Sequence, residues 1–314
     1  MLRELLDRNG FETTTEFCAQ ALLQPGLRPS YELLHAKGYG PSQLRELVAG
    51  VSENPSSVEP LEKLQRETDT EGTGAFQRVV LLNAAIASIQ VLPHLPVSDD
   101  VKAHFCDEFR FFASMPGEHA SRFEIGSASF AGMCKTATLR RFPAGQFDWE
   151  VGGISRSDIA AVSFTRLLPT IFFATFRMRG LFPVFFSHLS WRRPNRSLDE
   201  LEANRSYYRM AQAMKLQPAI KGFAACSWFR SPGVHRVSPH LAWLSTVVLE
   251  NGGFVVEAGE DTPDSGVLHR SRKRKELYEA RKFRPTKGLV MWPRDAMVAW
   301  AAAHPELETP PGQR

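Results

Sequence analysis

The sequence predicts a protein of the α+β or α/β class, in which a helical N-terminal region, residues 1–115, precedes an α/β domain with a mixed sheet, residues 116–305. In the first region, apolar residues recur every three or four positions, which is typical of amphipathic helices. In the second region, short runs of Val, Phe and Trp alternate with helical patterns, which indicates strands joined by helices. A polar tail, residues 306–314, follows.

The composition limits the classes of function. A chain of 314 residues, 43% of them hydrophobic, can bury a core without cross-links. Its 38 basic and 34 acidic residues nearly balance, so nucleic acid is not an expected partner. The cysteines form no C-x-x-C pair and have no histidine at ligand spacing, and the first residues lack a signal-peptide pattern. We therefore expect a cytoplasmic protein without a metal site and with four buried thiols: Cys18, Cys106, Cys134 and Cys226.

Punctuating residues predict where the elements begin and end. DTEGTG at 69–74 predicts a flexible joint within the helical region, and TATLRRFPAGQFDWEVGG at 136–153 predicts two strands joined by a turn. The clearest helix covers 195–216, with Ser197 as its cap and Glu200 at the capping-box position. The remaining expected elements are helices within 155–180 and at 239–250, 271–282 and 296–307, and strands at 183–191, 221–229, 254–259 and 288–292.

The most apolar stretch, residues 167–186, approaches the length of a membrane span. Pro169, Arg177 and Gly180 interrupt it, so we expect a buried core segment, with peripheral membrane contact as the alternative. The phenylalanines in and beside this stretch are expected to lie mainly in the core, and the alternative is an apolar channel for an acyl chain. They are Phe164, Phe172, Phe173, Phe176, Phe182, Phe185 and Phe186.

Residues 271–283, SRKRKELYEARKF, resemble a segment of the GNAT-type acyltransferase superfamily, N-x-x-A-x-x-L-Y-E-K-x-G-F. Ser271, Arg274 and Lys282 replace its Asn, Ala and Gly. The order strand, helix, strand, helix, strand over 221–292 is similar to the C-terminal half of that family, and LENGGFVVEA looks like the end of its cofactor helix and the next strand. The matching residues of the segment are Leu277, Tyr278, Glu279 and Phe283.

The resemblance implies an acyltransferase that uses a thioester of coenzyme A or of an acyl carrier protein as a co-substrate, with no tightly bound cofactor. It also implies that Tyr278 protonates the leaving thiolate. The family places two close glycines before the cofactor helix so that the backbone can approach the pyrophosphate, and here these positions fall on Arg236 and Ser238. The segment RSPGVHRVSPH can still bind an anion, through Arg230, Gly233, Arg236, Ser238 and His240.

Glu150 and Glu257 are the predicted general bases, because both lie in apolar strand patterns where burial would raise the pKa of a carboxyl group. Asp148 shares a strand face with Glu150, and the alternative for this pair is a solvent-facing polar row. For Tyr278, the alternative to catalysis is a ring packed on the sheet.

Other patterns predict no separate chemistry. Ser238 stands between His235 and His240 but lacks the G-x-S-x-G turn of a hydrolase, and His188 is expected in the core or at its rim. Nine Lys or Arg residues between 270 and 287 predict a solvated helix face that attracts a phosphorylated cofactor or a carrier protein, in preference to a nucleic-acid site.

The sequence therefore favours an acyltransferase-like enzyme that transfers an acyl group from a thioester to an acceptor, which we expect to be an amine. The alternative is a non-catalytic binding module with an apolar pocket for a lipid-like or aromatic ligand. The expected partners are a small-molecule substrate and an acyl carrier protein. No transmembrane segment is expected, and peripheral membrane contact stays open.

Overall fold

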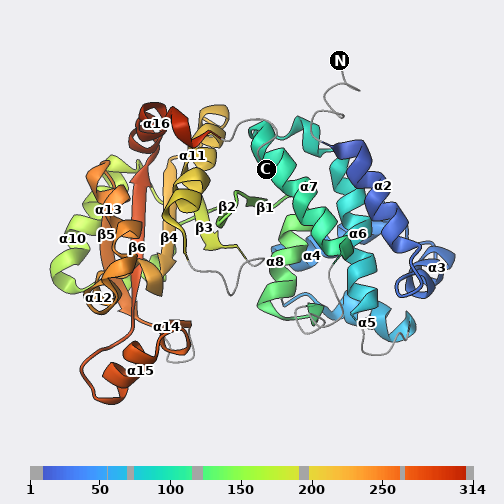
Figure 1. Cartoon of the computed structure of the whole chain (residues 1–314), viewed down its shortest axis with the longest axis horizontal. Coiled ribbons are helices and arrows are strands. Elements are labelled where there is room, and N and C mark those ends of the chain that lie inside the picture. Colours follow the sequence, from blue (N-terminus) through green and yellow to red (C-terminus); the bar gives the residue numbers. More distant parts are fainter. Residues whose placement is uncertain are drawn as a thin grey trace. The chain divides into compact units, whose positions relative to one another are not determined.

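Helices and a mixed sheet, both predicted from the sequence, make up the computed structural model, which describes residues 10–54, 56–68, 74–114, 123–190, 198–261 and 266–308 (Figure 1). The chain divides into two units: one contains residues 1–143 and 190–194, and the other contains residues 144–189 and 195–314. Residues 69–73 of the predicted joint and 309–314 of the predicted tail lie outside the described residues.

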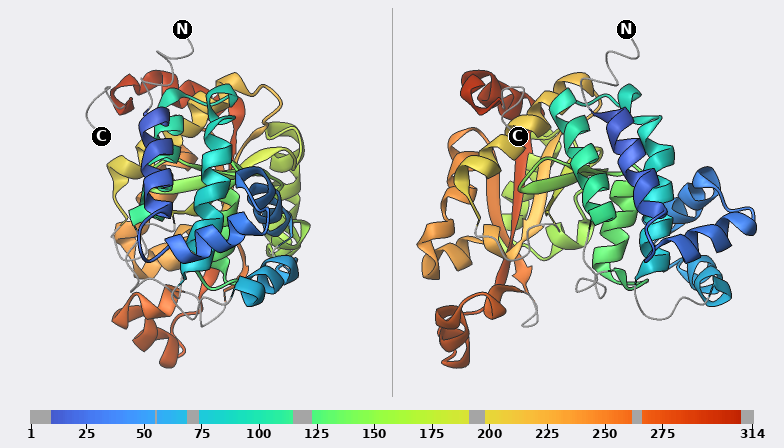
Figure 2. Two further views of the ribbon diagram at one scale, coloured as in Figure 1. Left: turned by 90° about the vertical axis from the view of Figure 1, so that its right-hand side faces the viewer. Right: turned by 45° about the vertical axis from the view of Figure 1, so that its right-hand side comes forward.

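The first unit is helical, as predicted, and is built around helix α6, Ala75–Ile89. Most residues of α6 are apolar and 12 of its 15 residues are buried, because the helix packs against α2, α4, α7 and α8. Figure 2 shows these helices, coloured blue to green, beside one another. The helices around α6 are α2 (Phe11–Leu22), α3 (Arg28–Ala36), α4 (Pro41–Glu53), α5 (Glu59–Thr68), α7 (Asp99–Ser114) and α8 (Ala128–Ala137).

The boundary between the units falls after residue 143, beyond the predicted position at residue 115. The reason is α8, which buries Phe130 and Met133 and packs against α4 and α6. Ser127 caps this helix, because its Oγ accepts a hydrogen bond from the Phe130 N–H at 3.0 Å. The short strand β1, Arg141–Pro143, ends the first unit.

The second unit contains the predicted mixed sheet, in the strand order β2, β3, β4, β6, β5. Neighbouring strands in this series are antiparallel, except for β3 and β4, which are parallel. All five occur where the sequence predicts strands. They are β2 (Phe147–Gly152), β3 (Val184–Leu189), β4 (Gly222–Ser227), β5 (Phe254–Glu260) and β6 (Thr286–Pro293).

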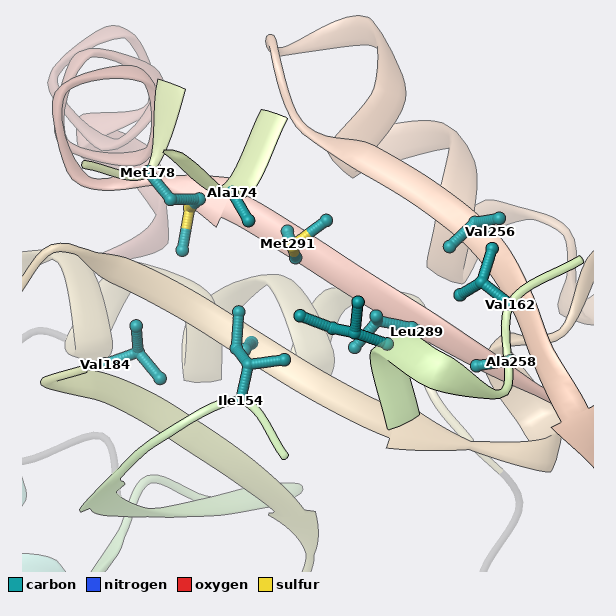
Figure 3. Packing of buried hydrophobic residues seen from close by; sticks show 11 residues of the cluster. Ile154, Val162, Ala174, Met178, Val184, Val256, Ala258, Leu289 and Met291 are labelled. Atoms are coloured by element: carbon teal, nitrogen blue, oxygen red, sulfur yellow. The ribbon is translucent and has the colours of Figure 1, made fainter. Parts of the chain in front are cut away.

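Helices cover both faces of this sheet. On one face, α9 (Arg156–Ala160), α10 (Phe164–Phe172) and the π-helical turn η3 (Phe173–Arg177) bury Ile159, Ala174 and other apolar side chains against the strands. Figure 3 shows this cluster, in which Ile154, Ala174 and Met178 lie over Val184, Leu289 and Met291. The other face is covered by α11 (Glu200–Leu216), α12 (Pro232–Val237), α13 (Trp243–Glu250) and α16 (Arg294–Ala303).

Tyr207 of α11 is the central aromatic residue of the second face. Its ring stacks on Phe147 at 5.5 Å and meets Phe223 and Trp292 edge-on at 5.3 and 5.8 Å. Because residues alternate between faces along each strand, Phe147, Phe223 and Trp292 converge on this helix from three strands.

Two predicted helix starts differ from the structure. Asp199 caps α11 by accepting the Glu202 N–H at 2.9 Å, whereas the predicted cap, Ser197, lies outside the described residues. The predicted helix at 239–250 begins as a 3₁₀ turn, Pro239–Leu241, and becomes α-helical only at Trp243.

The basic helix predicted at 271–282 is shorter than expected and corresponds to α15 (Arg272–Glu279). A short helix that was not predicted, α14 (Gly266–His269), precedes it between β5 and β6. Figure 1 shows them beyond the end of the sheet, and α15 packs mainly against α14. The helix ends before Arg281, which adopts a left-handed conformation with φ 59°.

The prediction that most phenylalanines of the 164–186 window lie in the core is wrong. Phe185 is buried and Phe173 and Phe186 are half-buried, but the others are exposed: Phe164, Phe172, Phe176 and Phe182. The physical reason is that α10 buries Thr170 and η3 buries Ala174 instead, so the opposite side of this segment, where most of these rings lie, faces outward.

Candidate functional site

The parallel strands β3 and β4 separate soon after they pair. Only Phe185 with Phe223 and Phe186 with Ala224 form register pairs within the described residues, although β3 continues to Leu189 and β4 to Ser227. Beyond these pairs, β3 stays bonded to β2 and β4 to β6. Each strand therefore turns one edge of backbone N–H and C=O groups toward the gap, and such groups require partners.

A cavity of about 430 Å³ lies where β4 ends. Phe186 of β3 and Cys226, Ser227 and Trp228 at the end of β4 form part of its lining. Phe186 and Cys226 point to the same face of the sheet because Phe186 pairs with Ala224, two residues before Cys226. The volume is within the range of small-ligand pockets.

Charged groups complete the lining of this cavity. Asp158 comes from α9, Asp261 follows β5, and Lys287 lies near the start of β6. Burial is the main cause that raises the pKa of the Cys226 thiol to about 12, and the neighbouring Asp158 carboxylate adds to it. Cys226 is therefore a neutral thiol at physiological pH and a poor nucleophile.

Ser227 follows Cys226 in β4, so its side chain points to the opposite sheet face, although the residue contributes to the cavity lining. Its Oγ is buried and has no hydrogen-bond partner within the described part of the chain. A buried hydroxyl without a partner is destabilising, and because this Oγ is not accessible, Ser227 lines the cavity through its other atoms.

A carboxylate and a histidine adjoin the cavity on the same sheet face. Glu150 lies opposite Phe186 in the β2 and β3 register, and its Oε1 is 2.6 Å from His188 Nε2. The His188 ring is 5.4 Å from the Phe186 ring, so the pair borders the cavity wall. Both side chains are half-buried, and a carboxylate at this distance fixes the orientation of an imidazole that can accept a proton.

The polar residues of β2 do not form the solvent-facing row that was the alternative for them. Asp148 is buried and Glu150 is paired with His188, whereas Val151, expected to point inward, is exposed. His188 is a rim histidine, as expected from the sequence, but it has the Glu150 carboxylate as its partner.

The structure does not bring the other predicted catalytic residues to this cavity. Glu257 lies on β5, on the sheet face opposite Glu150, and forms an ion pair of 3.1 Å with Arg236. Tyr278 lies on α15 and is 36% exposed. Neither residue is part of the cavity lining.

The residues predicted to bind the cofactor also point in different directions. Arg230 is buried, with Nη1 donating to the Tyr207 hydroxyl at 2.7 Å and its guanidinium 4.8 Å from the Phe147 ring. Ser238 Oγ accepts a hydrogen bond from Arg274 Nη1 at 2.9 Å. Arg236 and His240 are exposed, and Gly233 is buried within α12. These five predicted residues therefore do not converge on one site.

Local sequence patterns contain little sign of the residues that meet at this cavity. Asp158, Ser227 and Lys287 come from three separate segments, and only the fold makes them neighbours. The alternation of Asp148 with Glu150, and of Phe186 with His188, was the available signal, since both pairs face one side of adjacent strands. The separation of β3 from β4 has no recognisable sequence pattern.

In the described ranges, no group of three or more His, Cys, Asp or Glu side chains has the arrangement of a metal site, and no helix is long and apolar enough to cross a bilayer. Comparison with protein-family models, with curated proteins and with solved structures found no match to this chain, so only its own residues bear on its function.

Proposed function

We propose that the second unit transfers an acyl group from a thioester of coenzyme A or of an acyl carrier protein to an amine. The observation that carries the proposal is the separation of β3 and β4 beside a cavity. The pantetheine arm of such a donor is extended and contains amide groups. It can therefore lie along the gap between β3 and β4 with its amide groups beside the backbone of both strands.

The Glu150–His188 pair supplies the base of the proposed reaction. The amine nitrogen attacks the thioester carbonyl carbon, a C–N bond forms and the C–S bond breaks. His188 takes the proton that the nitrogen loses, while Glu150 stabilises the resulting imidazolium. The leaving thiolate then takes up this proton from the His188 imidazolium, which returns His188 to its neutral form.

The raised pKa of Cys226 favours direct transfer over a covalent acyl-enzyme. Its thiol, held protonated by burial and by Asp158, lies in the cavity lining but lacks the thiolate that attack on a thioester requires. The acyl group therefore moves in one step from donor to acceptor.

A non-catalytic binding module is the second candidate, and one observation favours it. A smaller cavity of about 160 Å³ is lined mainly by apolar side chains between α9 and η3, among them Ile159, Ala174 and Leu181. Such a cavity suits the end of an acyl chain and needs no catalytic residue. In this case a free fatty acid binds as well as its thioester.

Thermal unfolding in the presence of ligands tests both candidates. Binding to the folded state alone stabilises a protein by about 2.7 kcal/mol at a hundredfold excess over Kd. We expect coenzyme A, acetyl-coenzyme A and palmitoyl-coenzyme A to raise Tm, and palmitate alone to have a smaller effect. Equal shifts with palmitate and its thioester favour the binding module, and no shift with any thioester rules out the transferase.

Reversing the charge of a lysine in the cavity lining tests whether the donor binds in the cavity. Lys287 lines it, whereas Lys282 is exposed outside it, and both belong to the same basic run. We expect Lys287→Glu to weaken the shift caused by coenzyme A and Lys282→Glu to leave it unchanged. Equal loss in both variants would mean that the basic run attracts the donor without the cavity.

A further inference from the structure

Helix α10 and the turn η3 form a continuous segment, residues 164–177, with two opposite apolar faces. Thr170 and Ala174, followed by Met178, recur every four residues and are buried against the sheet. On the other side a second series with the same spacing points outward: Phe164, Leu168, Phe172 and Phe176 are 89%, 74%, 60% and 66% exposed. The segment is therefore apolar toward the solvent as well as toward the core.

This outward series is a contiguous surface and not a set of isolated residues. The rings of Phe172 and Phe176 lie 4.7 Å apart, and Ile171 is exposed beside them. Proteins rarely leave several large apolar side chains together on one helix face in water, so the surface requires an occupant.

The charges around the surface identify the occupant. The sequence contains no Asp or Glu from residue 159 to residue 198. Arg166, Arg177 and Arg179 flank the apolar series and are exposed, and only Arg179 has an acidic partner, Asp295 at 3.1 Å, among the contacts described for these three. A face of this kind matches an anionic surface with an apolar interior.

We propose that residues 164–177 dock in the plane of an anionic lipid bilayer. The outward Phe and Leu side chains enter the acyl-chain boundary, and the arginines bind lipid phosphates. With nine residues in α10 and five in η3, the segment is too short to span a bilayer, so it lies along the surface.

The small apolar cavity supports this orientation. Its lining includes Ile171 and Thr175, which are exposed on the same segment, together with the buried Ala174. The cavity therefore opens at the docking face and can receive the end of a lipid acyl chain.

A second copy of the chain fits the face less well. In a two-fold contact the same patch meets itself, so the arginines of both copies would approach each other without carboxylates between them. The proposal does not depend on acyl transfer, because it concerns only how this surface is covered.

Vesicle co-sedimentation tests the proposal, with the full chain and vesicles of phosphatidylcholine either alone or mixed with phosphatidylglycerol. We expect binding to the mixed vesicles that weakens with added salt. The variant with Leu168→Ser, Phe172→Ser and Phe176→Ser should bind at least about tenfold more weakly. A matched variant, Leu201→Ser with Leu249→Ser, changes leucines that are each 51% exposed elsewhere and should bind normally.

Two further measurements protect the result from a folding artefact. Circular dichroism must show unchanged unfolding for the triple variant, and in the otherwise intact chain Phe172→Trp should give a blue shift of emission only with phosphatidylglycerol vesicles. Absence of binding to these vesicles, or binding unaffected by the triple substitution, overturns the proposal. A concentration-dependent dimer that the triple substitution dissociates, without vesicle binding, also overturns it and assigns the face to a second copy.

Discussion

Glu150 Oε1 and His188 Nε2 lie 2.6 Å apart across the antiparallel strands β2 and β3. If this pair is the base of acyl transfer, His188→Gln removes the proton acceptor but keeps a polar side chain of similar size. We expect turnover, measured as release of free thiol from palmitoyl-coenzyme A, to fall by about 100-fold or more. The increase of Tm by the donor should stay, because the proposed donor site is the cavity and not the imidazole.

Tyr278→Phe is the matched control for this prediction. The resemblance of residues 271–283 gives Tyr278 the role of general acid, but the side chain lies on α15 outside the cavity lining. We expect turnover by this variant within about twofold of the unchanged protein. Loss of turnover in Tyr278→Phe with normal turnover in His188→Gln would support the role implied by the resemblance and contradict the one derived from geometry.

The contrast between these two residues shows what local sequence patterns can predict. Period-two and period-four patterns located the strands and helices, because each depends on residues close in sequence. The Glu150–His188 pair depends instead on the register of β2 with β3, strands separated in the chain by α9, α10 and η3. A resemblance of 13 residues pointed to Tyr278 but could not show that α15 lies beyond the end of the sheet.

The exposed face of α10 illustrates a second limit. Residues 164–177 have apolar side chains on two faces of the helix, and such a pattern normally predicts a helix buried in the core. Only burial distinguishes them: Ala174 packs on the sheet and Phe172 does not. The absence of acidic residues from 159 to 198 is visible in the sequence and favours the proposed docking face over a core helix.

The raised pKa of Cys226 predicts how the reactivity of its thiol depends on pH. Burial and Asp158 raise it from 9.0 to about 12, so alkylation by iodoacetamide should be slow at neutral pH and should still be rising at pH 10. Cys226→Ala should retain turnover, because the proposed direct transfer forms no acyl-enzyme on this residue. A covalent adduct on Cys226 after incubation with palmitoyl-coenzyme A, detected by mass spectrometry, would contradict direct transfer.

The same shift affects stability at alkaline pH. A thiol with a folded-state pKa above its unfolded value keeps its proton in the folded state while the unfolded state loses it. Its contribution is fully present below pH 9.0 and is lost progressively as the pH rises toward about 12. Cys18 has a similar shift, caused mainly by burial. Chemical denaturation between pH 8 and pH 11 should show falling free energy of unfolding, with a shallower fall in Cys226→Ala.

Arg230 and Tyr207 form a buried pair in the second unit, with 2.7 Å between Nη1 and the hydroxyl oxygen. The guanidinium Nη2 is buried without a hydrogen-bond partner in the part of the chain that the structure describes. Tyr207→Phe removes the acceptor of Nη1 as well, and we expect it to lower the free energy of unfolding by about 1–3 kcal/mol. Urea denaturation measures the change.

A double-mutant cycle isolates this interaction. Arg230→Met replaces the guanidinium by an apolar side chain among the aromatic rings, which removes the need for the Tyr207 hydroxyl as acceptor. We therefore expect Tyr207→Phe to be much less destabilising in the Arg230→Met background. Equal effects in both backgrounds would show that the stability contribution of Arg230 does not depend on the Tyr207 hydroxyl.

The Arg230→Met variant also tests the role in phosphate binding that the sequence predicts for Arg230. Unchanged binding of coenzyme A by this variant would exclude that role.

Arg274 links α15 to the rest of the second unit. Its Nε donates to the Val267 carbonyl at 2.6 Å, its Nη1 donates to Ser238 Oγ at 2.9 Å, and its guanidinium lies 4.9 Å from the Trp228 ring. Arg274→Met leaves two buried acceptors with one partner fewer each, so α14 and α15 should open more often.

Limited proteolysis measures this opening, and we expect faster trypsin cleavage of Arg274→Met within residues 270–284. Arg272→Met also removes one trypsin site but changes an exposed side chain, and it should cleave at the normal rate. Because Gly266 and Trp228 both line the cavity, Arg274→Met should also weaken the stabilisation by coenzyme A, and equal behaviour of the two variants would show that other contacts hold the helices in place.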